Sequence, residues 1–548
     1  MSAVAPRRDR AVVATVVAVT ALAFVSALTG DFVAWDDDVN FSGNPHFRGL
    51  GWQQIRWAFT TSHLGVYQPL AWLALELQFV IGGLSPAVYH LASWLLHALN
   101  AALVYRLIAT LLDRARGGAS EGAGGAASRP APQARFATIV FSGSRTPALR
   151  AGAADDQRTP RFAAAAAALL WALHPLRAEA VAWASCQPYL LATAFALLAT
   201  LAYLSAPSRF AAALLLYLAA VLSKAEAIAL PFVWLVLDVY PLRRLGGAAG
   251  WWRGAAVRRV WLGKLPFVVI AAGASIAAVA ARDHEHHLVG LDAAGVGPRL
   301  AHAAVAVWFY VGKTFAPWTL SPYYPRSPEL ARGLAAPAAA TAAVAAIALT
   351  ALLVWRARRA PGLCAAWIAY LVFLLPHAGL VRISNQLGAD RYTYLSSVAF
   401  AAAAAGGLAW LARGAAAAPR LRRALAPSVA AVLVVFAVLT VRQTDVWEST
   451  PSFWSFVYAR SGTTSGHVAN NWGAVLLQQQ RYREAAEVLS RAVALSPRNA
   501  KAFHNLGIAL THTGADADAS AAFAEETRLS ASARTPTGAP PAPFRSSR

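Results

Sequence analysis

Runs of apolar residues recur along the first 441 positions of the chain, separated by short polar or basic segments. Because a helix needs about 20 apolar residues to cross a bilayer, this pattern predicts an all-α, polytopic membrane protein. The predicted spans number eleven, at 11–28, 87–112, 162–173, 187–205, 210–222, 228–240, 260–281, 335–355, 365–375, 392–412 and 427–441.

Two further apolar segments, 68–81 and 300–315, are not predicted to cross. Glu76 interrupts the first, which fits a helix lying in the membrane interface. If segment 300–315 crossed the membrane fully, the basic loop 356–359 would lie on the outer side, whereas arginine-rich loops are usually cytoplasmic. We therefore expect the second segment to be interfacial or re-entrant.

Basic residues set the predicted orientation. Arg7, Arg8 and Arg10 precede the first span, which places the N-terminus in the cytoplasm. An odd number of spans then leaves the C-terminal part outside. Segment 113–161 is rich in Gly, Ala, Ser, Pro and Arg, and we expect it to be a disordered cytoplasmic insertion. The tail 531–548 is expected to be disordered for the same reason.

The helical pattern changes to a soluble type from Gly466 onward. The tripeptide Asn-Trp-Gly at 471–473 recurs as Asn-Leu-Gly at 505–507, 34 residues later. This period is typical of the tetratricopeptide repeat (TPR), so we predict repeats at 466–499 and 500–533 within a region 443–530. A stable array needs about three units, so a helix at 447–458 or a partner protein is expected to complete the stack.

Composition narrows the class of protein. The chain is 57% hydrophobic and only 14% charged, whereas soluble domains carry about 25% charged residues. The net charge of +22 comes mainly from arginines in short loops, so it marks topology, and no nucleic acid is expected as a partner. Abundant Arg and Ala indicate a GC-rich bacterial genome. We therefore expect the inner membrane, with the repeats in the periplasm; in a eukaryote the membrane would be the endoplasmic reticulum.

The cysteine and histidine residues give little indication of a disulfide or a metal site. Cys186 and Cys364 lie in different apolar blocks and form no recognisable framework or metal motif. His284, His286 and His287 cluster in one loop and could bind a divalent ion. A solvated loop is the favoured interpretation, and no metal site is predicted.

Three consecutive acids, Asp36, Asp37 and Asp38, follow the first span where it should leave the lipid. Carboxylates at this position are costly unless a site uses them or water reaches them. Adjacent acids repel, so one of them should have a raised pKa, which suits proton transfer. The alternative is a solvated acidic loop.

These residues and several later motifs resemble one family. The chain is similar to bacterial relatives of the transmembrane and tetratricopeptide-repeat O-mannosyltransferases, which have the GT-C fold. The matching motifs are Trp-Asp-Asp-Asp-Val at 35–39, Asn-Pro at 44–45, Arg-Trp-Ala-Phe-Thr-Thr at 56–61, Gln-Pro-Leu-Ala-Trp-Leu at 68–73, Tyr-His-Leu at 89–91, His-Pro-Leu-Arg-Ala-Glu-Ala-Val-Ala-Trp at 174–183, Leu-Ser-Lys at 222–224 and Ala-Asp-Arg-Tyr-Thr-Tyr-Leu at 389–395.

The resemblance implies a GT-C-like glycosyltransferase domain at 1–442. It also implies transfer of a sugar, mannose in this family, from a polyprenyl-phosphate donor in the membrane lipid to a protein hydroxyl on the outer face. Asp36 or Asp37 would be the catalytic carboxylate that accepts or orients the acceptor proton. The residues expected to bind substrate, including cations for the leaving phosphate, are Asp38, Arg177, Glu179, Lys224, Lys313, Asp390 and Arg391.

Departures from the family pattern leave a second interpretation open. Gln68 replaces the histidine of Trp-His-Pro, Lys224-Ala225-Glu226 stands where relatives have Lys-Pro, and Tyr189 stands where an aspartate is common. These changes fit a catalytically inactive scaffold whose repeats bind protein partners. In an active enzyme, the repeats would present the acceptor protein. A transporter is disfavoured because no pair of broken helices recurs in the two halves.

Overall fold

The computed structural model describes residues 4–124, 153–205, 207–284, 295–380, 386–414 and 418–534. Within these ranges the secondary structure is helical, apart from one isolated bridge between Pro325 and Gln386. The prediction of an all-α protein is therefore confirmed. The chain divides into two compact units, Met1–Glu448 and Ser449–Arg548, so the boundary lies six residues after the predicted end at 442.

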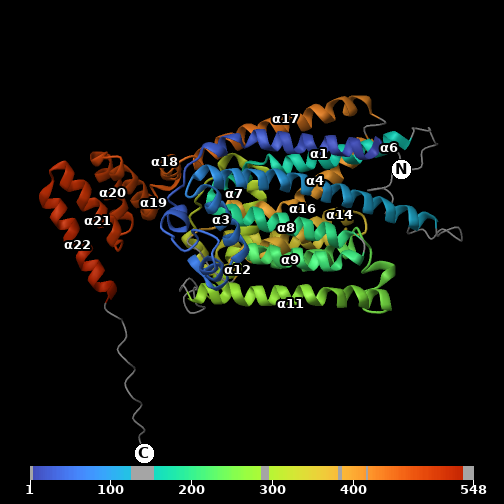
Figure 1. Cartoon of the computed structure of the whole chain (residues 1–548), viewed down its shortest axis with the longest axis horizontal. Coiled ribbons are helices and arrows are strands. Elements are labelled where there is room, and N and C mark those ends of the chain that lie inside the picture. Colours follow the sequence, from blue (N-terminus) through green and yellow to red (C-terminus); the bar gives the residue numbers. More distant parts are fainter. Residues whose placement is uncertain are drawn as a thin grey trace, which may run out of the picture. The chain divides into compact units, whose positions relative to one another are not determined.

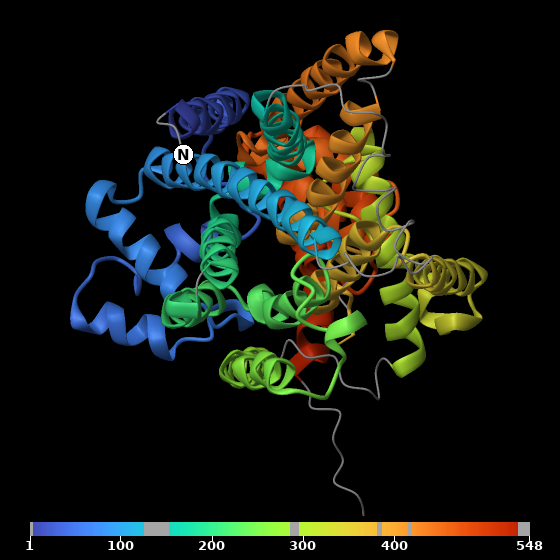
Figure 2. The same cartoon turned by 90° about the vertical axis from the view of Figure 1, so that its right-hand side faces the viewer.

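The first unit is a bundle of helices (Figure 1). Figure 2 views the same bundle from one end. In chain order its α-helices are α1 (Val4–Ala23), α2 (Trp52–Thr60), α3 (Pro69–Gly82), α4 (Pro86–Gly124), α6 (Ala153–Ala172), α7 (Ala178–Ala182), α8 (Gln187–Leu204), α9 (Phe210–Ser223), α10 (Leu230–Val239), α11 (Ala255–His284), α12 (Val296–Phe315), α13 (Pro337–Trp355), α14 (Pro361–Leu374), α15 (Thr393–Ser396), α16 (Val398–Gly414) and α17 (Pro419–Thr444).

Several of these helices suit a membrane. Five described helices are long and apolar enough to cross one, and a bent pair at Asp390–Ser396 and Val398–Gly414 would make a sixth. Shorter apolar helices occur at Pro69–Gly82, Pro207–Ser223 and Pro361–His377. The five long helices are Pro86–Arg116, Ala184–Leu204, Ala255–His284, Pro337–Trp355 and Arg423–Trp447.

The predicted count of eleven spans is not reached by this criterion. The expected spans 11–28 and 162–173 fall on α1 and α6, whose first halves carry several charged residues. The expected span 228–240 falls on α10, which has only 10 residues. Segment 300–315, which was not expected to cross, lies in α12, and this helix is not among the candidate spans.

Helix extends into both ends of the segment 113–161 that we expected to be disordered. α4 continues to Gly124 and α6 begins at Ala153. Alanine and arginine have high helix propensity, which explains why these ends continue the adjoining spans. Residues 125–152 lie outside the described ranges. At the C-terminus, helix α22 (Asp516–Arg534) enters the predicted tail, and residues 535–548 lie outside the described ranges.

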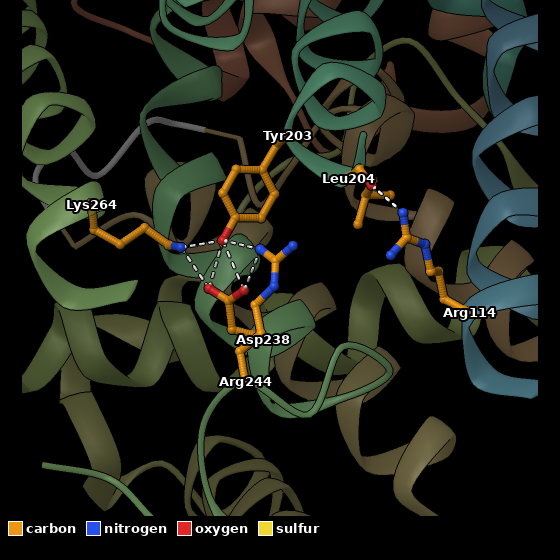
Figure 3. Close-up of polar contacts among 6 residues, drawn as sticks. All are labelled: Arg114, Tyr203, Leu204, Asp238, Arg244 and Lys264. Atoms are coloured by element: carbon orange, nitrogen blue, oxygen red, sulfur yellow. Dashed lines mark hydrogen bonds and ion pairs between the residues drawn. The ribbon is translucent and has the colours of Figure 1, made fainter. Parts of the chain in front are cut away.

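A buried ionic network connects three helices at one end of the bundle (Figure 3). The Asp238 carboxylate on α10 accepts hydrogen bonds from Tyr203 Oη of α8, at 2.8 and 2.7 Å, and from Lys264 Nζ of α11, at 2.5 Å. Arg244 Nη1 lies 3.4 Å from the same carboxylate. Asp238 is 0% exposed, so its charge depends on these partners.

The second unit contains the repeats. Its helices are α18 (Thr450–Ser461), α19 (Gly466–Gln478), α20 (Tyr482–Leu495), α21 (Ala500–Thr513) and α22. A Cβ at Gly473 would meet the Leu489 side chain at 2.5 Å, and one at Gly507 would meet Phe523 at 2.6 Å. A larger residue at either position would force these side chains to move, so glycine favours close packing of the paired helices. α18 packs against α19, where we expected a capping helix.

Candidate functional site

The three acids predicted for the reaction centre have different surroundings. They lie in the irregular segment that follows α1 and leads into the short helix Asp38–Ser42. Asp37 is fully buried, Asp36 is half-buried, and Asp38 is exposed. The alternation follows from the tight turn of this segment, which directs successive side chains in different directions.

Asp37 anchors the segment. Its carboxylate accepts hydrogen bonds from Val33 N at 2.9 Å, from Ser185 N at 3.0 Å and from Ser185 Oγ. Burial raises the pKa of Asp37 to about 7, and the hydrogen bonds from Ser185 and Val33 oppose this shift. With its oxygen atoms engaged in this way, Asp37 holds the loop against the turn Ala184–Cys186 that begins the long helix α8.

Asp36 has a free carboxylate in a charged environment. Among the described residues its side chain makes no hydrogen bond or ion pair. Burial raises its pKa to about 6, the cations Arg391 and Lys224 lower it, and Asp38 raises it. The structure therefore brings Asp36 near two cations that come from distant parts of the chain. At neutral pH the group is mainly ionised and can accept a proton.

Arg391 lies in the turn Asp390–Tyr392 before α15. Its Nη1 pairs with Glu179 Oε1, and its backbone N donates to Glu179 Oε2 at 2.9 Å. The guanidinium lies over the rings of Trp183 and Tyr392, at 5.2 and 4.9 Å. Glu179 therefore orients Arg391, and the remaining guanidinium N–H groups make no hydrogen bond to another described residue. Such groups suit a phosphate oxygen.

Lys224 follows α9 and belongs to the same cluster. Its Nζ donates to Gln68 Oε1 at 2.9 Å and lies 4.8 Å from the centre of the Tyr189 ring. Burial lowers the pKa of Lys224 to about 8. Gln68 and Tyr189, two positions that depart from the family pattern, are thus the direct partners of this cation.

The remaining predicted residues have mainly local partners. Asp390 is buried and accepts a hydrogen bond from Tyr324 Oη at 2.8 Å. Lys313 Nζ donates to Thr319 O at 2.6 Å and lies 4.8 Å from the Tyr324 ring. These contacts fix α12 and the turn before α15 next to Arg391, which fits a supporting role for Asp390 and Lys313.

Arg177 is also engaged within the protein. It is 1% exposed, and it donates to Thr393 O, Thr393 Oγ1 and Tyr394 O at 3.2, 2.7 and 3.1 Å. Its guanidinium also lies over the Trp171 ring at 5.5 Å. Arg177 therefore holds α15 in place, two residues after Arg391.

Two polar residues of the cluster were not predicted from sequence. Glu226 is 4% exposed, and its Oε1 has no hydrogen-bond partner among the described residues. Its Oε2 lies 3.4 Å from His377 Nε2, and the His377 ring stacks on Tyr392 at 4.1 Å. Glu226 stood out only as a departure after Lys224, and no sequence spacing links it to His377.

An apolar cavity of about 550 Å³ reaches this region. Arg177 and His174 form its polar wall, and His174 Nε2 lies 2.9 Å from Thr314 O. The apolar lining includes Leu353, Leu363, Phe315, Trp367, Phe400 and Phe436. A hydrocarbon chain fits such a lining better than water does.

Among the described residues, no group of three or more His, Cys, Asp or Glu side chains could hold a metal ion. In the predicted histidine cluster, His284 Nδ1 lies 3.2 Å from Ser62 Oγ. His286 and His287 lie outside the described ranges.

Comparison with known proteins supports only the C-terminal unit. A family model for the TPR repeat matches residues 473–514, which confirms the predicted repeats in this part. No curated protein and no solved structure matches the chain. The O-mannosyltransferase part of the resemblance therefore stays a prediction.

Proposed function

We propose that this protein is a membrane glycosyltransferase. It moves a sugar, mannose by the resemblance, from a polyprenyl-phosphate donor to a protein hydroxyl on the outer face of the membrane. The observation that carries the proposal is the free, half-buried Asp36 carboxylate near Arg391 and Lys224. A base beside cations is what this transfer needs, because the acceptor loses a proton while the departing phosphate gains charge.

Asp36 and the two cations can account for every bond, proton and charge in the proposed transfer. The acceptor oxygen bonds to the anomeric carbon as the bond from that carbon to the phosphate oxygen breaks. The acceptor proton goes to Asp36, and the electron pair leaves with the phosphate. Arg391 and Lys224 stabilise the phosphate charge. Asp37, bonded to Val33 and Ser185, keeps the loop in position without taking part.

The apolar cavity supports a lipid-linked donor. Arg177 at its wall bonds to the backbone at Thr393, two residues after Arg391. A polyprenyl chain in the cavity would therefore reach the Arg177 side of the cluster, although none of Asp36, Lys224 and Arg391 lines the cavity. The TPR unit suits an acceptor protein, because stacked helical repeats form a surface that binds peptides.

A second candidate function is an inactive scaffold that binds proteins through its repeats. Tyr189 favours it, because this ring occupies the space in front of Lys224 where the family pattern has an acid. The two functions differ in whether any sugar is transferred.

Membrane vesicles with the full-length protein provide the test. With polyprenyl-phosphate mannose labelled in the sugar, the wild type should label protein, and Arg391→Lys should lower the rate by about 100- to 1000-fold, because a fixed donor to the departing charge is lost. Nucleotide mannose alone should give no label. Absence of transfer by the wild type, with acceptor binding intact, would establish the scaffold instead.

A further inference from the structure

A second large cavity lies at the end of the first unit opposite Asp36. It has a volume of about 740 Å³ and is bounded by α1, α4, α6, α8 and α9. Its charged lining residues are Arg106, Arg116, Arg161, Arg209, Asp9 and Asp113. The four arginines outnumber the two aspartates, so the lining carries an excess of positive charge.

One of the two acids is already engaged. Tyr105 Oη donates a hydrogen bond of 2.6 Å to Asp9 Oδ1. No ion pair joins Arg106, Arg161 or Arg209 to an acid within the described part of the chain. These three guanidinium groups therefore line the cavity without an ion-pair partner in the described ranges, although Arg161 lies near enough to Asp113 to interact with it electrostatically. Planar guanidinium groups bind phosphate through paired hydrogen bonds.

The same cavity has an apolar side. Leu198 and Leu201 on α8 and Leu216 on α9 line it, and all three are partly exposed. Their neighbours on α9 include Leu215, which is 67% exposed and faces outward from the bundle. A ligand that fills the cavity should therefore combine an anionic head with a hydrocarbon chain.

The position of the cavity along the bundle matches a lipid headgroup. α8 begins next to Ser185, which bonds to Asp37, and it ends at Leu204 beside the cavity. Its 18 residues span roughly 27 Å at about 1.5 Å per residue. This is close to the thickness of the hydrocarbon core, about 30 Å. If the Asp36 loop lies at one membrane surface, the arginines lie at the other.

We propose that this cavity binds the phosphate of an anionic phospholipid of the bilayer, with an acyl chain along the leucines of α8 and α9. Basic pockets between membrane helices favour anionic headgroups in this way. The proposal concerns groups that the proposed sugar transfer does not use, and it does not depend on that activity. A soluble phosphate ester has the same phosphate group but no acyl chain, so a binding experiment can distinguish it from a phospholipid as the ligand.

The experiment is native mass spectrometry of the purified full-length protein in detergent, titrated with phosphatidylglycerol. The combined variant R106Q/R161Q/R209Q should lower its apparent affinity by at least about tenfold, because each arginine near an anionic headgroup contributes to binding. The control is R253Q/R258Q/R259Q, which removes the same charge from exposed arginines outside the cavity and should bind as the wild type does.

Three results would overturn the proposal. The first is equal loss of phosphatidylglycerol binding in both combined variants, which would indicate general charge attraction. The second is binding of phosphatidylcholine as tight as that of phosphatidylglycerol. The third is binding of glycerol 1-phosphate as tight as that of the lipid, which would assign the cavity to a soluble phosphate ester. Circular dichroism of each variant checks that the helices remain folded.

Discussion

At the scale of single residues, adjacent carboxylates have separate tasks. Asp37 is saturated by hydrogen bonds from Val33 and Ser185, whereas Asp36 has none to a described side chain and faces two cations. The sequence predicted a site at these acids and left open which of Asp36 and Asp37 is the base. Only the fold separates them, because the partner Ser185 is distant in sequence and carries no motif.

Asp37→Asn should destabilise the protein more than it slows the chemistry. The amide can still accept from Ser185, but its NH₂ group would face Val33 N, leaving a buried donor unsatisfied at a cost of about 1–3 kcal/mol. We expect a lower Tm and a transfer rate within a few-fold of the wild type for the folded fraction. A catalytic loss as large as that of Asp36→Asn, at unchanged Tm, would contradict this division of roles.

The pKa values of Asp36 and Lys224 predict a bell-shaped pH profile. Asp36, with a pKa of about 6, acts as a base only when ionised, so transfer should rise as pH passes 6. Lys224, with a pKa of about 8, holds phosphate only when charged, so transfer should fall above pH 8. Lys224→Arg should remove the alkaline limb and keep the acid limb, because arginine stays charged. An alkaline limb that persists in Lys224→Arg would show that another group causes it.

At the scale of helices, the ionic network of Asp238 and Lys264 sets how α8, α10 and α11 meet. No part of it was predicted, because its residues come from three segments with no fixed spacing. The sequence did predict most of the apolar helices, since their hydropathy is local. Fewer than eleven of the described helices qualify as spans by length and composition, because helices as short as α10, or as charged at one end as α1, also occur in the bundle.

A double-mutant cycle tests this network. Asp238→Ala or Lys264→Met alone should destabilise the protein by about 3–5 kcal/mol, because each removes the nearest charged partner of a buried charge. Arg244, 3.4 Å from Asp238, should place Lys264→Met at the lower end of this range. The double variant should recover much of the loss. Thermal unfolding in detergent measures the three variants. Additive losses in the double variant would mean that the two charges do not depend on each other.

At the scale of the whole chain, the sequence predicts the repeats of the second unit more directly than the candidate site of the first. The repeats were predictable from their period of 34 residues, and a family model matches 473–514. The candidate site of the first unit joins residues near 36, 224 and 391, and only folding brings these into one cluster. The sequence indicated this cluster through resemblance, whereas Glu226 and His377 became visible only in the structure.

Removal of the second unit should separate donor from acceptor binding. A chain that ends at Glu448 should bind polyprenyl-phosphate mannose as the full chain does, because the cluster lies within the first unit. Transfer to protein acceptors should fall more than transfer to a short hydroxyl peptide. Binding of labelled donor and transfer to both acceptors are the measurements. Equal loss of donor binding and of both transfers would contradict an acceptor role for the repeats.

The most direct test of the account is the single-turnover rate of sugar transfer by purified Asp36→Asn at saturating polyprenyl-phosphate mannose, with donor affinity measured in the same sample. The control is Asp31→Asn, an exposed acid of the same loop. We predict a rate about 100- to 10,000-fold below wild type for Asp36→Asn, as for loss of a general base, with donor affinity retained and Asp31→Asn unaffected. Transfer by Asp36→Asn at the wild-type rate would contradict the account.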